Sequence, residues 1–236
     1  MTEANLLIYA LIFCIITIAF YAISSRLQQS YQLIWLNPML VTILLIVPIL
    51  LLTNISYAQY YQATEALSLL TEPAIVALGF PLYQQLKQIK YQWRQIIALL
   101  ALGVVIVLAV SFALTMLWIQ QEKLAIALSL KSVTTPIGIA LTKQFSADSS
   151  ITAFAIIIAG LAGGLLGQNW LKRFGVHSAQ AQGLAIGAAS HVIGTAVLAK
   201  VSPQHTAYSS VALIFSALLT ALVTPLLLPI LIDFYQ

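Results

Sequence analysis

About eight long apolar stretches, joined by short polar connections, constrain this chain more than any other feature. A helix needs about 20 mostly apolar residues to cross a bilayer. Hydrophobic residues make up 61% of the chain and charged residues 7%, whereas soluble domains average about 25% charged residues. So few charged groups cannot cover a water-exposed surface. The sequence therefore predicts an all-α integral membrane protein with a single transmembrane domain over residues 1–236.

The apolar stretches predict about seven to eight helical elements, some of them broken or re-entrant. The third stretch contains Glu72, Pro73 and Pro81, and proline kinks or breaks a helix. The fifth is interrupted by Lys131 and Pro136, so neither half is long enough to span, and we expect it to enter the membrane and return. The stretches cover residues 5–24, 38–52, 64–85, 93–118, 123–142, 150–171, 180–199 and 207–232.

The positions of the basic residues predict the orientation. The loop at 84–94 is rich in Lys and Arg, and the loop at 53–63 has neither. Cytoplasmic loops collect these residues, which places 84–94 in the cytoplasm and 53–63 outside. Lys172 and Arg173, after the sixth stretch, are also cytoplasmic only if the fifth stretch does not cross.

The order of the stretches suggests an inverted repeat. A plain helix, a broken helix and a long helix follow one another twice, in halves at about residues 36–119 and 150–233. In transporters, inverted repeats with broken helices in matching positions mark a binding site at the middle of the membrane.

The strongest polar cluster surrounds Lys131. A lysine at membrane depth is costly, by about 2.5–3.5 kcal/mol on insertion scales, and marks a functional site by default. Ser132, Thr134 and Thr135 precede or flank Pro136, an arrangement typical of a helix N-terminus, where backbone N–H groups favour anions. The cluster predicts a pocket for a carboxylate or phosphate. The alternative is that Lys131 extends to the interface and the hydroxyls only cap a helix.

A second polar cluster occupies the seventh stretch, which is rich in Gly, Ala and Ser. Its candidate binding residues are Ser190, His191 and Thr195, and Gly194 is a candidate helix break. A histidine here can bind or relay a proton near neutral pH. The equally weighted alternative is a single hydrogen bond from His191 to a neighbouring helix.

Other functional classes find little support. Cys14 stands alone, the histidines are far apart, and no metal site or cofactor is predicted. His177 and His205 fall in predicted loops. No set of nucleophile, base and orienting residue indicates an enzyme, and the scattered basic residues do not indicate nucleic-acid binding. Glu72 is a weak candidate for ion coupling, along with His191; a position at the membrane edge, in contact with Lys131, suits Glu72 at least as well.

Three segments carry a resemblance to a known family. They are KSVTTPIGIAL at 131–141, GLAIGAASHVIGTA at 183–196 and EPAIVALGFPLYQQL at 72–86. In these segments the chain resembles the LrgB/CidB-like membrane proteins, over about residues 60–230. The chain departs from the family at Gln182, where members often have a basic residue, and at Val197 and Lys200.

The resemblance implies two functions. Family members are described as holin-like or antiholin-like regulators of murein hydrolase activity and autolysis. Plant relatives translocate glycolate and glycerate, and some bacterial relatives are associated with pyruvate. With the Lys131 cluster, this leads us to expect a membrane transporter of small monocarboxylates such as pyruvate, glycolate or lactate. The alternative is a holin-like or antiholin-like regulator.

The resemblance also implies partners and a location. A multi-pass protein of the bacterial cytoplasmic (inner) membrane is expected, in contact with lipid and with a small carboxylate substrate. A small membrane partner of the LrgA/CidA type and a homo-oligomer are also expected.

Overall fold

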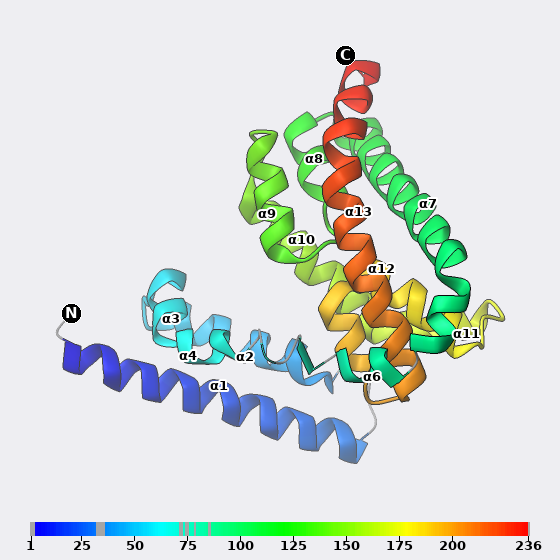
Figure 1. The fold of residues 1–236 in the computed structure, drawn as a ribbon. Coiled ribbons are helices and arrows are strands. Elements are labelled where there is room, and N and C mark those ends of the chain that lie inside the picture. Colours follow the sequence, from blue (N-terminus) through cyan, green and yellow to red (C-terminus); the bar gives the residue numbers. More distant parts are fainter. Residues whose placement is uncertain are drawn as a thin grey trace. The chain divides into compact units, whose positions relative to one another are not determined.

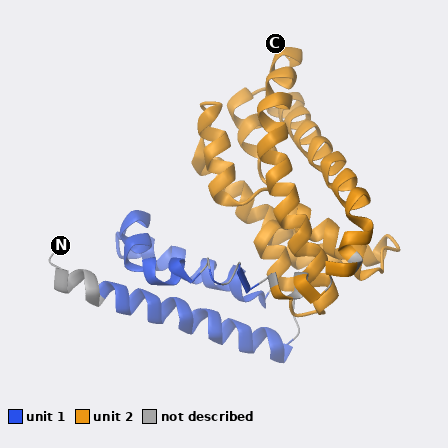
Figure 2. Ribbon diagram, viewed as in Figure 1, with its two compact units in different colours: residues 1–77 blue, residues 78–236 orange. Residues whose placement is uncertain are grey.

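All elements that the computed structural model describes are helices (Figure 1). The described residues are 3–31, 36–70, 73, 76–77, 79–84 and 86–235. They belong to two compact units, residues 1–77 and 78–236 (Figure 2). The prediction of an all-α membrane protein is confirmed, because several helices are long and apolar enough to cross a bilayer. These are Tyr9–Tyr31, Ile89–Ile119, Ser149–Arg173, Ala179–Leu198 and Pro203–Tyr235. The single domain and the repeat halves stay predictions.

The helices described in full for the first unit precede residue 70. They are α1 (Glu3–Tyr31), α2 (Pro38–Leu52), α3 (Tyr57–Ala63) and α4 (Glu65–Leu69). The axes of α2 and α3 differ by 118°, so together they form a broken span or a re-entrant loop. The hydroxyls of Thr17 and Tyr60 lie 3.0 Å apart and tie α3 to α1. Glu72 lies outside the described residues.

The second unit holds the rest of the described chain. Its elements are α6 (Gly79–Gln84), α7 (Leu86–Ile119), α8 (Glu122–Ser129), α9 (Thr135–Gln144), α10 (Ser149–Ala162), the π-helix η2 (Gly163–Gly167), α11 (Gln168–Arg173), α12 (Ala179–Leu198) and α13 (Pro203–Tyr235). Of the predicted helix breaks in the third stretch, Pro73 is helical and exposed, and Pro81 lies inside α6.

Residues 122–144 form a re-entrant hairpin, called hairpin 1 here, made of α8, the break at 130–134 and α9. Its arms are about 12 and 15 Å long, too short for a hydrocarbon core of about 30 Å. Phe145, just after α9, packs against the same core cluster as Phe112 of α7 and Tyr235 of α13. Hairpin 1 thus returns to the end of the unit from which it entered (Figure 1). The predicted break and return of the fifth stretch are confirmed.

A second hairpin, called hairpin 2 here, is formed by the two arms of α12, residues 179–190 and 192–198. Its backbone reverses at His191, which has φ 42° and ψ −135°. A Cβ on Gly194 would lie 3.2 Å from the carbonyl oxygen of Ile186, whereas eight residues of straight helix rise about 12 Å. Moreover, α13 begins beside the start of α12, because His205 hydrogen-bonds Gln182 at 3.1 Å. Although α12 is long enough to cross, it enters the unit and returns.

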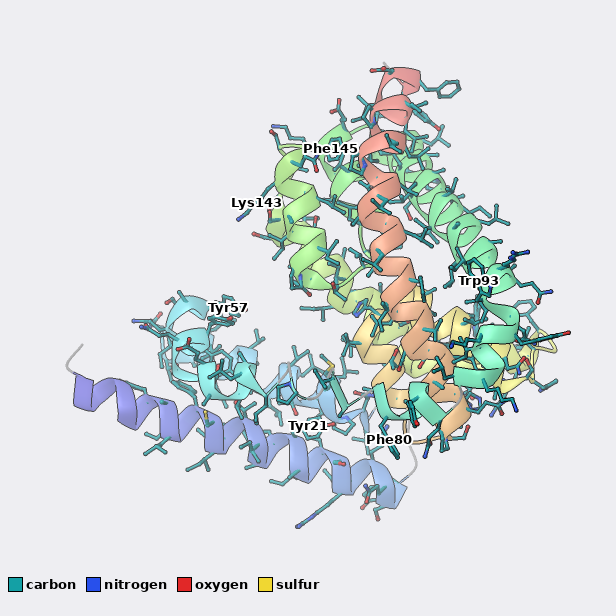
Figure 3. The ribbon with its side chains drawn as sticks, in the orientation of Figure 1. Tyr21, Tyr57, Phe80, Trp93, Lys143 and Phe145 are labelled. Carbon is teal, nitrogen blue, oxygen red and sulfur yellow. The ribbon has the colours of Figure 1, made fainter. Side chains whose placement is uncertain are left out.

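Charges separate between the two ends of this unit. Hairpin 1 returns to its own side, so the start of α7 and the end of α11 share one end, which we call the basic end. It carries Lys87, Lys90, Arg94, Lys172, Arg173 and Lys200, whereas the opposite end carries Glu122, Lys123, Lys143, Asp148 and Asp233. Figure 3 shows Trp93 toward the basic end and Lys143 and Phe145 at the other. The positive-inside rule assigns the basic end to the cytoplasm.

Candidate functional site

The tips of the two hairpins approach each other at Ile156, in the middle of α10. From hairpin 1, Val133 packs against the Ile156 side chain, and a Cβ on Gly138 would lie 2.6 Å from its Cδ1 atom. From hairpin 2, Nε2 of His191 lies 2.9 Å from the Ile156 carbonyl oxygen. Two interrupted helices therefore enter the unit from opposite ends, and their tips both contact Ile156. This is the arrangement that forms midplane binding sites in transporters.

Lys131 lies at the tip of hairpin 1, half-buried. Its ammonium group donates a hydrogen bond to the hydroxyl of Ser111 on α7. Among the described residues, no carboxylate forms an ion pair with this ammonium group. A half-buried cation at membrane depth attracts an anion, so the functional interpretation of Lys131 stays a prediction that this position permits.

The hydroxyls near Lys131 lie at the start of α9. Thr134 is the N-cap residue of this helix, with extended backbone, but its side chain forms no capping hydrogen bond. Thr135 and Pro136 follow in the first turn, where proline lacks only an N–H group that would have no intrahelical partner. The predicted helix N-terminus at this position is therefore present. The Lys131 ammonium and the N-terminus of α9 belong to one hairpin tip.

The polar residues of hairpin 2 lie at its tip and are buried. The Ser190 hydroxyl is fully buried and has no hydrogen-bond partner among the described residues. It faces Gly163 of η2, where an added Cβ would lie 2.7 Å from the Ser190 Cβ. Thr195 donates to the carbonyl oxygen of His191 at 2.9 Å. The predicted break at Gly194 lies instead at His191, and the absence of a side chain at Gly194 allows the two arms to approach.

The positive φ of His191 should affect the thermal stability of variants at this position. Its positive φ lies in a region that costs a non-glycine residue about 1–3 kcal/mol. His191→Gly should therefore unfold at a higher temperature than His191→Ala, because both variants lose the imidazole and glycine alone relieves the strain. Thermal unfolding in detergent measures this difference.

The control substitution is Ala188→Gly, in the regular first arm of hairpin 2. There glycine should lower stability by about 1 kcal/mol. Equal stability of His191→Gly and His191→Ala would contradict the strained reversal.

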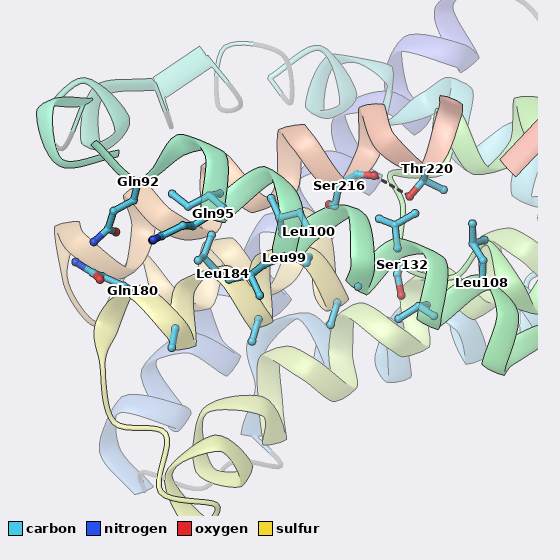
Figure 4. Close-up of a pocket in the computed structure, with 18 of the residues that line it drawn as sticks. Gln92, Gln95, Leu99, Leu100, Leu108, Ser132, Gln180, Leu184, Ser216 and Thr220 are labelled. Carbon is cyan, nitrogen blue, oxygen red and sulfur yellow. Dashed lines mark hydrogen bonds between the residues drawn. The ribbon is translucent and has the colours of Figure 1, made fainter. Parts of the chain in front are cut away.

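A cavity of about 550 Å³ lies between α7, the first arm of hairpin 2, the tip of hairpin 1 and α13 (Figure 4). Three amide groups and one serine hydroxyl gather at the end nearer the basic end, and the other hydroxyl groups lie deeper. The polar lining residues are Gln92, Gln95, Ser178 and Gln180 at the first end, and Ser129, Ser132, Ser216 and Thr220 at the second. Leucines and valines of α7 separate the two sets. The cavity is open along one side, because Ala185 and Ala189 are exposed.

The cavity contains one of the predicted binding residues, Ser132. Lys131, Thr134, Thr135, Ser190, His191 and Thr195 are not among the described residues that line it. The cavity residues on α7 and α13 escaped the sequence analysis because glutamines, serines and threonines in apolar helices have many structural roles. The one available signal was Gly103, a glycine in the middle of a 34-residue helix.

His205 is a correction to the sequence analysis. It was expected in a loop, but it lies in the first turns of α13. Its Nδ1 atom lies 2.8 Å from the Ser202 hydroxyl, and its Nε2 atom bonds Gln182, which is 1% exposed. Gln182 also accepts from Gln168 at 3.2 Å. A polar network thus joins the first turns of α11, α12 and α13. His177, by contrast, is exposed in a loop, as expected.

Comparison with known proteins identifies the family of this chain. The profile of the LrgB-like family matches residues 17–230, so the similarity begins earlier than the motifs indicated. The holin-like protein CidB of Staphylococcus epidermidis is 31% identical over 92% of this chain and 94% of its own. The holin-like protein CidB of Staphylococcus aureus is 32% identical over 90% and 93%. No solved structure matches the chain. This membrane protein therefore belongs to the LrgB-like family.

Proposed function

We propose that the protein is a holin-like regulator of murein hydrolase activity and autolysis. Relatives named holin-like protein CidB support this proposal, since they are similar to this chain over nine-tenths of its length or more. A bacterial cytoplasmic membrane is the expected location. A small LrgA/CidA-type membrane partner and a homo-oligomer belong to the same proposal.

A second candidate function is the transport of small monocarboxylates. The observation that favours it is the meeting of two opposed re-entrant hairpins at Ile156, with Lys131, which forms no ion pair with a described carboxylate, at one tip. A protein that only perforates a membrane has no need of interrupted helices that bury polar groups at this depth. The two functions are compatible, because metabolite flux can influence autolysis.

The transport proposal assigns roles to the predicted residues. Lys131 neutralises the carboxylate, and Ser132, Thr134 and Thr135 hydrogen-bond it. Ser190, His191 and Thr195 form the opposing half of the site, with His191 as the candidate for proton coupling. Glu72, the weaker candidate for ion coupling, lies outside the described residues.

One experiment separates the two functions. Liposomes containing the purified protein are tested for uptake of labelled pyruvate, glycolate and lactate, and in parallel for leakage of a trapped fluorescent dye. Saturable uptake without leakage supports transport. Leakage that rises with protein density and shows no solute selectivity supports the holin-like activity alone and excludes selective transport.

A further inference from the structure

The cavity beside α7 contains a glycine that packing does not explain. Gly160, Gly183 and Gly187 lie where an added Cβ would meet a neighbouring helix. Gly103 differs, since a Cβ there would have no atom within 4 Å. A glycine in the middle of a helix is normally unfavourable relative to alanine. The missing side chain at Gly103 instead leaves the cavity wide, because Gly103 lines it.

The inner end of the cavity has the properties of a wetted site. Ser129, Leu130 and Ser132 line it at the end of α8 and in the break of hairpin 1. Irregular backbone at membrane depth is tolerated where it is buried in protein or lines a water-filled cavity. The adjacent hydroxyls of Ser216 and Thr220 add polar groups at the same level (Figure 4). The Ser129, Ser216 and Thr220 hydroxyls each donate to a backbone carbonyl oxygen of their own helix, so the irregular break of hairpin 1 is the feature that favours water here.

The charge of Lys131 lies next to this inner end. Gly103, Val107 and Ser111 follow one another at four-residue spacing and therefore share one face of α7. Gly103 and Val107 line the cavity, and Ser111, one turn farther, accepts the hydrogen bond of Lys131. From Gln92 to Leu108 the lined part of α7 is about 24 Å long. The cavity thus leads from the basic end of the unit toward an ammonium group at mid-depth.

We propose that this cavity is a solute-binding chamber, entered from the basic end, for small organic anions that combine a carboxylate with a short apolar body. The inference rests on the transport proposal and extends it to the chamber and to Gly103. The carboxylate is drawn toward Lys131 and Ser132, and the apolar body lies against Leu100, Val104 and Leu108. Amides at the entrance, Gln92 and Gln180 among them, contact the anion as it enters.

Thiol labelling tests the chamber independently of transport. The single native cysteine is first replaced, Cys14→Ser, and Gly103→Cys is then introduced. Leu102→Cys is the matched control, because Leu102 directly precedes Gly103 in α7, lies outside the cavity lining and is 58% exposed on the apolar surface. The reagent is the membrane-impermeant anion sulfonatoethyl methanethiosulfonate, applied to sealed vesicles of both orientations.

We expect Gly103→Cys to react at least tenfold faster than Leu102→Cys, and only in vesicles whose basic end faces the reagent. Pyruvate or glycolate should slow the reaction at position 103. Equal or absent labelling at the two positions would show a lipid-filled groove and overturn the chamber. Labelling that neither anion slows would overturn the ligand class. If an anion slows the labelling but the protein transports none of the tested solutes, the chamber is supported and the transport proposal is rejected.

Discussion

Lys131→Ala is expected to lower carboxylate uptake into liposomes by about 10- to 100-fold. A hydrogen bond to a charged group contributes about 1.5–3 kcal/mol, and each 1.4 kcal/mol corresponds to a factor of ten in affinity. The ammonium group of Lys131 has one described partner, the Ser111 hydroxyl, so it remains available to an anion. Alanine removes the charge, so only the neighbouring hydroxyls would offset the free-energy cost of desolvating the carboxylate. Initial rates over a range of substrate concentrations measure the effect.

Lys143→Ala is the matched control, because Lys143 lies in the last turn of α9 on the same hairpin but is exposed. Its uptake should equal that of the native protein. Both variants should also elute as folded protein from a sizing column. Native uptake by a folded Lys131→Ala variant would remove Lys131 from the binding site and leave it a structural residue bonded to α7.

Gly187→Ala is expected to destabilise the protein by about 1–3 kcal/mol, the usual cost of overpacking a close contact. The added Cβ would lie 2.7 Å from the Cα atom of Ser209, on the backbone of α13. Backbone atoms cannot rotate away as a side chain can, so hairpin 2 and α13 would have to separate. Thermal unfolding of the detergent-solubilised protein should therefore occur at a lower temperature.

The same substitution at Gly103 is the control, with the opposite sign. Because no atom lies within 4 Å of an added Cβ, Gly103→Ala should stabilise α7 by about 0.5–1 kcal/mol. If the two variants unfold at the same temperature, the close approach of α12 to α13 does not contribute to stability.

The basic architecture could be predicted from the sequence because it depends on local properties. Long apolar runs require lipid as solvent, whatever the details of packing. The break of hairpin 1 was also predictable, since Pro136 cannot continue a helix from its N-terminal side and Lys131 interrupts the apolar run. The basic residues at 84–94 together with Lys172 and Arg173 favoured a fifth stretch that returns to the side from which it enters.

The reversal in hairpin 2 was not predictable at its position. His191 carries the positive φ although it is neither glycine nor proline. Its imidazole contacts residues distant in sequence: Nε2 lies against the Ile156 carbonyl oxygen, and the ring occupies the space beside Gly160. The predicted break at Gly194 came from residue type alone, whereas the actual break lies where the hairpin tip meets α10.

The sequence by itself determined the membrane class, the family, the interrupted fifth stretch and the identity of the polar residues at both hairpin tips. Only the tertiary structure decided that the two tips meet at Ile156, that Lys131 pairs with Ser111, and that a cavity lies beside Gly103. The physical reason is the distance along the chain over which each interaction acts. Hydropathy and helix-start signals act over a few residues, but the approach of two tips depends on small side chains from helices that are far apart in the chain.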